Sequence, residues 1–259
     1  MNLHISEIES FYSETELGSI TSRFINESIN KMNSLIVPSI TERKVLIGYG
    51  YPTPYMKKFA QESSQTICLM PEQQGVVSWP QKGLNKTMLI EETQWPLESE
   101  TADIVIMVHG LETCENPQEL LEEVWRVLMP EGYLLLVVPN RTGFWARSDL
   151  TPFGHGRPFS LPQLVRLLGE NKFQITITQA ALFTPPSSKS FFIKSSMLLE
   201  KIGKKFGTKV MGGVIMMLAK KKIHAPTTLK ISDTIKVPLG ILEGLIKPKP
   251  KPFPSDRYK

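Results

Sequence analysis

Hydrophobic residues recur at helical spacing near the start of the chain and in short unbroken runs further on. Apolar side chains at every third or fourth position predict a helix over residues 11–37, which Pro38 ends. The same spacing predicts helices over residues 53–62, 117–129, 161–169 and 190–206. Short apolar runs predict seven strands, over residues 45–47, 66–70, 86–90, 102–108, 133–138, 173–178 and 210–219. Because strands alternate with helices, the pattern favours an α/β fold with a mostly parallel sheet covered on both faces.

Charge is divided unevenly along the 259 residues. Residues 1–188 hold 14 basic and 21 acidic side chains, whereas residues 189–259 hold 16 basic and 4 acidic ones. The main body is therefore acidic, and nothing in it favours a nucleic-acid substrate. The positive charge is concentrated in the segment 190–206 and in a Pro/Lys-rich tail over residues 223–259, which is expected to be disordered.

The sequence offers few residues for metal or disulfide chemistry. Cys68 and Cys114 cannot form a disulfide framework, and the spacing of Cys and His predicts no metal site. Residues 1–10 lack the apolar segment of a signal peptide. The longest apolar run, residues 210–219, is shorter than the roughly 20 residues of a membrane span. We therefore expect a cytoplasmic protein.

A turn containing two glycines separates the first predicted strand from the helix that follows. Gly48 and Gly50 flank Tyr49, so the backbone can turn sharply and approach a ligand closely. Amides at the start of the next helix favour an anion. This arrangement is typical of nucleotide-type cofactor sites at the carboxyl edge of a parallel sheet. A tight turn without a ligand is the alternative.

A set of motifs follows the later strands in a recognisable order: Glu91-Glu92, Trp95-Pro96-Leu97, Ala102-Asp103, His109-Gly110-Leu111-Glu112, Asn116-Pro117, Arg126-Val127-Leu128 and Pro130-Glu131-Gly132. With these motifs, residues 40–180 and a last strand at 210–220 resemble the class I S-adenosylmethionine-dependent methyltransferases. The likeness is greatest to the methyltransferase type 11 group that acts on small molecules. The resemblance implies a Rossmann-like seven-stranded methyltransferase sandwich and direct in-line methyl transfer.

The resemblance also implies S-adenosyl-L-methionine as the cofactor and assigns residues to it. Gly48, Tyr49 and Gly50 match the loop that meets the methionine end of the cofactor. Glu91, with Glu92 as its alternate, matches the acid beside the adenine ring. His109 and Gly110 match the end of the fourth strand, which lines the methyl end.

Three positions depart from the family pattern. Met70 stands where an acid usually holds the ribose hydroxyls, and Glu72 is the nearest carboxylate that could serve instead. Thr113 stands where a histidine often follows Leu-Glu, and Pro52 replaces the third glycine of the loop. These departures support a second hypothesis, a methyltransferase-like binding or regulatory protein without turnover.

The loop over residues 140–159 concentrates the candidates for acceptor binding. The predicted substrate contacts are Arg141, Trp145, Arg147, Phe153 and Arg157. His155 lies between two glycines and is the candidate base, while the arginines suit a carboxylate or phosphate. The alternative is an ordered lid in which Arg157 and His155 bind only backbone carbonyls.

The predicted domain comprises residues 1–222, with an N-terminal helical segment over 1–40 and a basic amphipathic insert over about 187–209. Three interpretations of residues 190–206 stay open: a cap over the sheet, a lining for an apolar acceptor, or a peripheral contact with an anionic membrane. The expected partner is a small-molecule substrate. No nucleic acid and no obligatory protein partner are indicated.

Overall fold

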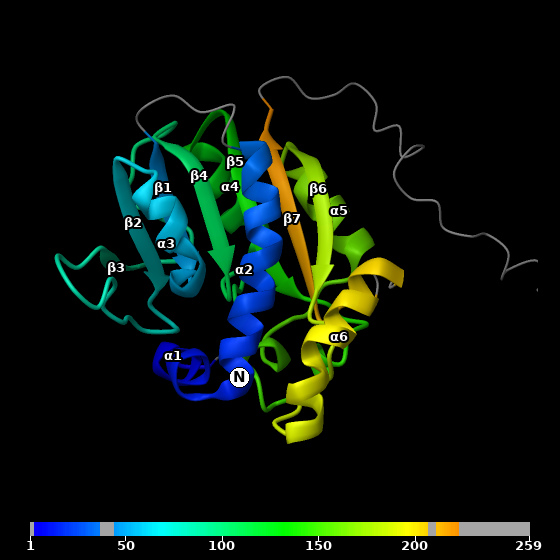
Figure 1. Ribbon diagram of the computed structural model, residues 1–259. Helices are drawn as coiled ribbons and strands as arrows, with labels where there is room; N and C mark the ends of the chain where they lie inside the picture. Colours follow the sequence, from blue (N-terminus) through cyan, green and yellow to red (C-terminus); the bar gives the residue numbers. More distant parts are fainter. Residues whose placement is uncertain (1–2, 37–43, 207–210, 223–259) are drawn as a thin grey trace, which may run out of the picture. The chain divides into compact units, whose positions relative to one another are not determined.

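Seven strands form one sheet in the computed structural model, which describes residues 3–36, 44–206 and 211–222 (Figure 1). The strands are β1 (Val45–Gly50), β2 (Gln65–Pro71), β3 (Thr87–Ile90), β4 (Ala102–Val108), β5 (Leu128–Pro139), β6 (Phe173–Ala181) and β7 (Val214–Lys221). Their order is β3-β2-β1-β4-β5-β7-β6, and β7 pairs antiparallel with both neighbours. This confirms the mostly parallel seven-stranded sheet. The predicted tail over residues 223–259 lies outside the described residues.

Helices cover both faces of this sheet. They are α1 (Ile5–Glu14), α2 (Glu16–Ile36), α3 (Thr53–Gln61), α4 (Pro117–Val127), α5 (Leu161–Glu170) and α6 (Ser190–Phe206), with 3-10 turns η2 (Trp145–Arg147) and η3 (Pro152–Gly154). Alternate strand residues enter different cores because side chains alternate across a strand. Leu46 and Ile104 pack with α1, α2 and α3, whereas Ile47 and Val105 pack with α4 and α5. In the described ranges, no helix has the length and apolarity needed to cross a membrane.

The N-terminal segment forms two helices, so the single helix predicted over residues 11–37 is wrong. Thr15 adopts an extended conformation, with φ −104° and ψ 141°, between α1 and α2. Its hydroxyl donates to the carbonyl of Phe11 at 2.6 Å and accepts from the amide of Gly18 at 2.9 Å. These bonds satisfy groups freed at the break. As a separate element, α1 lies beside the carboxyl ends of the strands, beyond their arrowheads (Figure 1).

The strand after α4 begins earlier than the sequence indicates. The predicted strand begins at residue 133, but β5 already begins at Leu128 and contains residues 130–132, a Pro-Glu-Gly sequence typical of a turn. Glu131 has φ 63°, and the pairing of β4 with β5 shifts register between Ala102 and Ile104. The Pro-Glu-Gly sequence therefore forms an irregular stretch within a strand. β7 begins at Val214, later than the predicted position 210.

An ion pair on α4 fixes the loop between β3 and β4. The Glu123 carboxylate accepts hydrogen bonds from Arg126 Nη2 at 2.7 Å and Arg126 Nε at 2.8 Å. It also accepts from the backbone amide of Trp95 at 2.8 Å. The Trp95 ring stacks on Tyr49, with ring centroids 5.1 Å apart. The pair therefore supports, through Trp95, the strand end that carries the glycine turn.

We expect Glu123→Gln to lower the free energy of unfolding by about 1 kcal/mol at neutral pH, since it removes a charge-assisted bidentate contact on a partly exposed pair. Burial raises the pKa of Glu123, but hydrogen bonds from Arg126 and from the Trp95 amide bring the net pKa below its ordinary value. A lowered folded-state pKa stabilises the protein above the unfolded value and is lost as pH falls. Urea unfolding should therefore show the difference shrinking below about pH 4. The exposed control Glu119→Gln should differ little from wild type at any pH; equal losses in both variants would contradict the prediction.

Candidate functional site

The ends of β1 and β4 meet at the glycine turn. Gly50 has φ +79°, in the region that favours glycine, and the amide of Tyr51 donates to the carbonyl of Val108 at 2.7 Å. A Cβ atom on Gly50 would lie 2.4 Å from that carbonyl oxygen. A Cβ on Gly48 would lie equally close to the sulfur of Met56. The backbone packing therefore requires glycine at position 50, whereas the atoms closest to Gly48 belong to the side chains of Met56 and Pro52.

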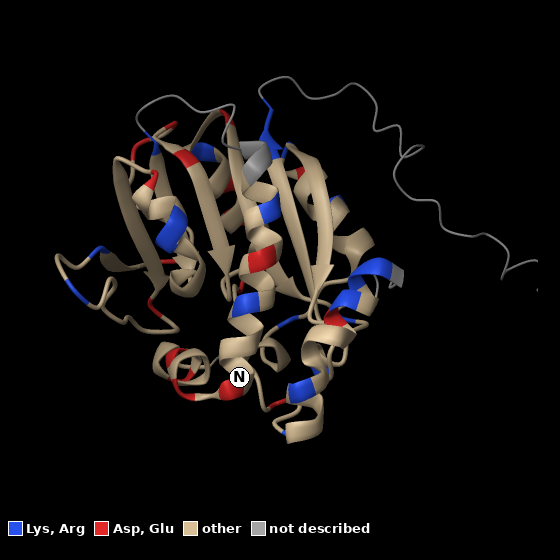
Figure 2. Ribbon diagram, viewed as in Figure 1, with Lys and Arg blue, Asp and Glu red and all other residues tan. Residues whose placement is uncertain are grey.

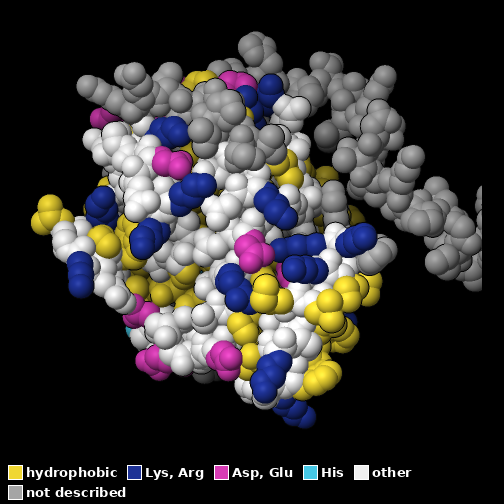
Figure 3. Space-filling view, viewed as in Figure 1, with side chains coloured by type: hydrophobic (Ala, Val, Ile, Leu, Met, Phe, Trp, Pro, Cys, Tyr) yellow, Lys and Arg dark blue, Asp and Glu magenta, His cyan; other side chains and the backbone are white. Residues whose placement is uncertain are grey.

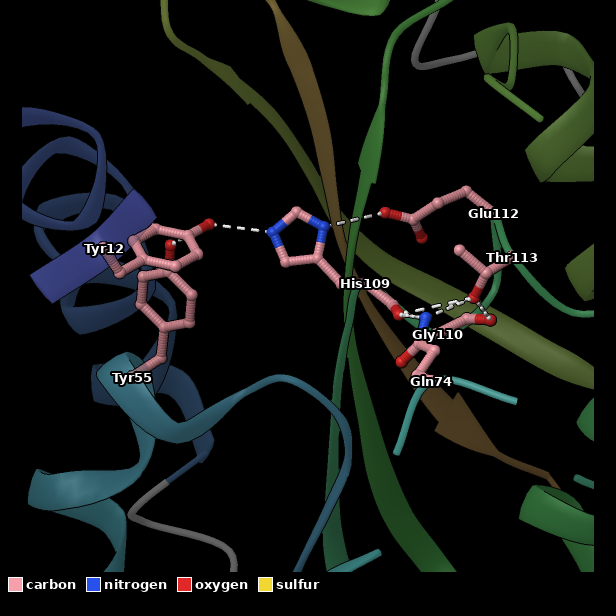
Figure 4. Close-up of polar contacts among 7 residues, drawn as sticks. All are labelled: Tyr12, Tyr55, Gln74, His109, Gly110, Glu112 and Thr113. Atoms are coloured by element: carbon pink, nitrogen blue, oxygen red, sulfur yellow. Dashed lines mark hydrogen bonds and ion pairs between the residues drawn. The ribbon is translucent and has the colours of Figure 1, made fainter. Parts of the chain in front are cut away.

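A buried chain of polar side chains lies beside this turn (Figure 4). The hydroxyl of Tyr55 donates to that of Tyr12 at 3.0 Å. The Tyr12 hydroxyl lies 2.9 Å from His109 Nε2, and His109 Nδ1 lies 3.2 Å from Glu112 Oε1. Tyr12 comes from α1, Tyr55 from α3, and the other two from the loop after β4. Three segments that are distant in the sequence thus form one hydrogen-bonded chain.

The donors and acceptors of this chain can be assigned from its ends. Burial, and then the neighbouring Tyr55 hydroxyl, raises the pKa of Tyr12 well above its usual value, so Tyr12 keeps its proton. Because Tyr12 already accepts from Tyr55, its own proton is available to His109 Nε2. In a singly protonated imidazole, this arrangement places the proton on Nδ1, from which it is donated to Glu112. The hydrogen-bond network thus leaves Nε2 as a proton acceptor.

The backbone around His109 fixes the direction of the imidazole. His109 has φ 54°, an uncommon conformation for a residue other than glycine. The side-chain amide of Gln74 donates to the His109 carbonyl at 2.7 Å and to the hydroxyl of Thr113 at 2.8 Å. The neighbouring Gly110 allows close packing, since a Cβ there would lie 2.6 Å from the Tyr49 ring. Strained conformations held by several contacts are common at functional sites.

Three buried polar atoms near this chain have no hydrogen-bond partner among the described residues. They are Glu112 Oε2, Gln74 Oε1 and the Tyr49 hydroxyl. A buried polar atom without a partner costs about 1–3 kcal/mol, so such atoms call for an explanation. The first two are acceptors beside the end of β4. They would suit a ligand that carries N–H donors or positive charge.

The acidic residues predicted to contact the cofactor are not part of the buried hydrogen-bonded chain. Glu72 and Glu91 are exposed, and Glu91 forms an isolated bridge with Gln94. Glu92 is buried, but its carboxylate accepts from the amide of Glu115 at 3.2 Å. Met70 is buried and its sulfur lies 3.4 Å from the amide nitrogen of Val77.

The loop over residues 140–159 packs against the buried chain through its apolar and backbone groups. The Phe153 ring lies 4.6 Å from the His109 ring, centroid to centroid, and Trp145 lies behind it at 5.8 Å. Trp145 is buried and donates to the carbonyl of Thr184 at 2.6 Å. The amide of Arg157 donates to the carbonyl of Glu112 at 2.6 Å. This loop therefore closes one side of the His109–Glu112 pair.

The charged side chains of the same loop point elsewhere. His155 is partly exposed, and its Nε2 lies 3.3 Å from the carbonyl oxygen of Asp149. Arg141 donates from Nε to the carbonyl of Pro158 at 3.2 Å. Arg147 and Arg157 are exposed residues. The predicted base and guanidinium groups are thus outside the buried chain, although the loop that carries them contacts it.

Sequence reasoning missed Tyr12, Tyr55 and Glu112 as members of the site. The three-residue separation of His109 and Glu112 was a usable signal, because it brings an acid and an imidazole together within one turn of chain. Nothing in the sequence pairs Tyr12 with His109, 97 positions later. That contact depends on how α1 packs across the sheet edge.

A cavity of about 340 Å³ lies away from this site. It is lined by Val45, Ile47, Ser64, Gln65, Thr66, Ile67, Lys86, Leu97 and Thr101. These residues belong mainly to the first halves of β1 and β2 and to the loops before β2, β3 and β4. Ligands of parallel α/β sheets bind at the opposite, carboxyl edge, so the cavity is a poor candidate for the cofactor. In the described part of the chain, no group of three or more acidic, His or Cys residues is placed to hold a metal.

Comparisons with known proteins agree with this topology. Residues 44–136 match the family model described as a methyltransferase domain. A Thermotoga maritima S-adenosylmethionine-dependent methyltransferase superposes with a TM-score of 0.51 at 18% identity, covering 80% of this chain and 100% of that one. Enzymes described as S-adenosylmethionine-dependent methyltransferases from Archaeoglobus fulgidus and Aquifex aeolicus each give 0.50. Their identities are 15% and 14%, covering 76% and 83% of this chain and 94% and 97% of theirs. No curated protein matches the sequence significantly.

Proposed function

We propose that this chain is a class I S-adenosylmethionine-dependent methyltransferase that transfers a methyl group to a small-molecule acceptor by direct in-line attack. The observation that carries the proposal is the buried His109–Glu112 pair at the carboxyl end of β4. It places a proton acceptor at the sheet edge where ligands of such folds bind. The acidic main body of the chain supports a small acceptor over a nucleic acid.

The residues around the turn fit the charge of S-adenosylmethionine. The unpartnered acceptors Glu112 Oε2 and Gln74 Oε1 match a molecule that carries an ammonium and a sulfonium group. Gly50, at the end of β1, supplies the sharp turn beside them. These residues would hold the methionine end. When bound, the cofactor supplies a methyl group that is already activated by its positive sulfur.

We assign the proton transfer of the reaction to His109. An acceptor hydroxyl or amine must lose a proton as its oxygen or nitrogen is methylated, and Nε2 can take it. Glu112 holds the opposite nitrogen, which fixes the tautomer and stabilises the imidazolium that forms. The Tyr12 hydroxyl now occupies the position from which an acceptor would donate to Nε2. Acceptor binding therefore requires Tyr12 to move aside.

The other predicted site residues keep a place in the proposal. Arg141, Arg147 and Arg157 would hold a carboxylate or phosphate of the acceptor at the outer side of the loop, where they are exposed. His155 remains the alternative base. His109 is favoured over it because His109 is buried, oriented by a carboxylate and placed at the end of β4.

A second candidate function is binding or regulation without turnover. The observation that favours it is the filling of the turn region by protein atoms. The rings of Tyr12 and Tyr51 stack with centroids 5.7 Å apart. The backbone amide of Tyr51 also donates a hydrogen bond to the carbonyl of Val108, at the end of β4. Met70 replaces an acid and is buried. A protein of this kind would keep the fold and use its surface to bind a partner.

Titration calorimetry tests the first function. We expect the purified chain to bind S-adenosylhomocysteine with a Kd in the micromolar range, about −8 kcal/mol. Adenosine alone should bind more weakly, because it lacks the amino-acid end that the orphaned acceptors would recognise. Absence of heat with both S-adenosylmethionine and S-adenosylhomocysteine at millimolar concentration would reject the proposal in favour of the second candidate.

A further inference from the structure

One face of α6 exposes a stripe of large apolar side chains. Phe191, Leu198 and Ile202 are 73%, 61% and 46% exposed. Their separations of seven and four residues place them on one side of a helix. Figure 3 shows hydrophobic side chains gathered on this part of the surface. Contiguous exposed apolar patches on a soluble chain commonly mark an interaction site.

A row of positive charge runs beside the apolar stripe. Lys194 and Lys201 are exposed and also seven residues apart, so they lie along the same side of the helix. Figure 2 shows basic residues distributed along α6. The two rows are parallel, with cations flanking one edge of the apolar stripe. This is the arrangement of helices that lie in the plane of a membrane interface.

The single acidic residue of α6 does not offset this charge. The Glu200 carboxylate is buried and accepts from the amides of Leu182 at 3.2 Å and Phe183 at 2.8 Å. Its remaining ionic contact is with Lys204 of the same helix, at 3.3 Å. The acid thus anchors the inner face of α6 to the end of β6. Within the described helix α6, no acid besides Glu200 accompanies the exposed Lys194 and Lys201.

The inner face of α6 packs against the rest of the domain. Gly203 packs so closely on Phe183 that an added Cβ would lie 2.2 Å from its ring. Ser196 is buried on the same side. Because this face is fixed against the domain, α6 cannot turn its apolar stripe inward. The stripe therefore stays on the outside of the described structure.

We propose that the outer face of α6 docks on the surface of an anionic lipid membrane. Phe191, Leu198 and Ile202 would enter the boundary between headgroups and acyl chains. Lys194 and Lys201 would stay at the level of the negatively charged headgroups. A membrane of this composition offers apolar and anionic groups side by side, which matches both rows at once. Neither the apolar stripe nor the row of lysines alone would favour an anionic membrane over other partners.

Flotation of the full chain with lipid vesicles tests the proposal. Vesicles of phosphatidylcholine with phosphatidylserine should bind the protein at least about tenfold more strongly than vesicles of phosphatidylcholine alone, because each nearby lysine contributes favourably at an anionic surface. Binding should weaken with added salt. Failure to bind either vesicle, or equal binding to both, would overturn the proposal.

Two variants locate the contact. The double variant Lys194→Glu/Lys201→Glu and the double variant Phe191→Ser/Leu198→Ser should each reduce binding to the anionic vesicles about tenfold or more. The control Lys57→Glu/Lys58→Glu makes the same change in net charge on the exposed side of α3 and should bind like wild type. If both α6 variants keep full binding, the contact lies elsewhere, for example in the basic residues 223–259, and the proposal is wrong. Preferred binding to an acidic protein over vesicles would also reject it.

Discussion

Replacing Gly50 with valine is expected to abolish cofactor binding and to lower the free energy of unfolding by about 3–5 kcal/mol. The glycine has φ +79°, where a β-branched residue is strained. Its Cβ would also meet the backbone of Val108 at 2.4 Å and that of Gly110 at 2.9 Å. Backbone atoms cannot swing aside as a flexible side chain can. The ends of β1 and β4 would have to separate, and the turn that we propose faces the cofactor would be lost.

Gly83 offers a matched control for this substitution. It also has a positive φ, +101°, but a Cβ there would meet nothing within 4 Å. Gly83→Val therefore carries the conformational cost alone, about 1–2 kcal/mol. Chemical unfolding and calorimetry with S-adenosylhomocysteine should separate the two variants. Wild-type cofactor affinity in a folded Gly50→Val protein would show that the cofactor does not use this turn.

Replacing His109 with asparagine is expected to reduce methyl transfer about 10²–10⁴-fold, the usual contribution of a general base. Asparagine suits the left-handed backbone at this position, where φ is 54°, so the main-chain geometry should be kept. Affinity for S-adenosylhomocysteine should change by less than about threefold, since the unpartnered acceptors belong to Glu112 and Gln74. Transfer of a labelled methyl group to small molecules of a cell extract measures the first effect.

The variant His155→Asn distinguishes the two candidate bases. We expect it to keep the transfer rate within about threefold, because the His155 imidazole lies beside the carbonyl of Asp149 and outside the buried hydrogen-bonded chain. The opposite result would return the role of base to His155. Similar losses in both variants, with lowered thermal stability, would indicate a structural role for each.

The fold could be predicted because its signal is local. A strand buried on both faces must be almost continuously apolar, as β4 is, and an amphipathic helix must repeat its apolar side chains, as α4 does. The errors occurred where local signals compete. The apolar spacing continues through Thr15, but the Thr15 hydroxyl donates to the carbonyl of Phe11 where the helix is interrupted. The sequence Pro130-Glu131-Gly132 is typical of a turn, yet it lies within β5.

The site was only partly predictable for the same reason. Residues at the ends of β1 and β4 could be named because parallel strands bring their carboxyl ends to one edge of the sheet. The roles within that edge depend on contacts that the sequence does not encode locally. The carboxylate partner of His109 lies three residues away, and this spacing is a weak signal in the sequence. Its hydroxyl partner lies on α1, 97 residues away, and no local pattern indicates it.

The sequence by itself determined the strand and helix pattern, the glycine turn and the separation of acidic body from basic C-terminal part, since each depends on neighbours along the chain. Only the tertiary structure decided that His109 joins Tyr12 and Glu112, and that the glycines at 48 and 50 accommodate protein atoms. It also decided that Glu200 faces inward, which leaves the outer face of α6 apolar and positive. These features depend on which surfaces meet when distant segments pack, and packing is a property of the whole chain.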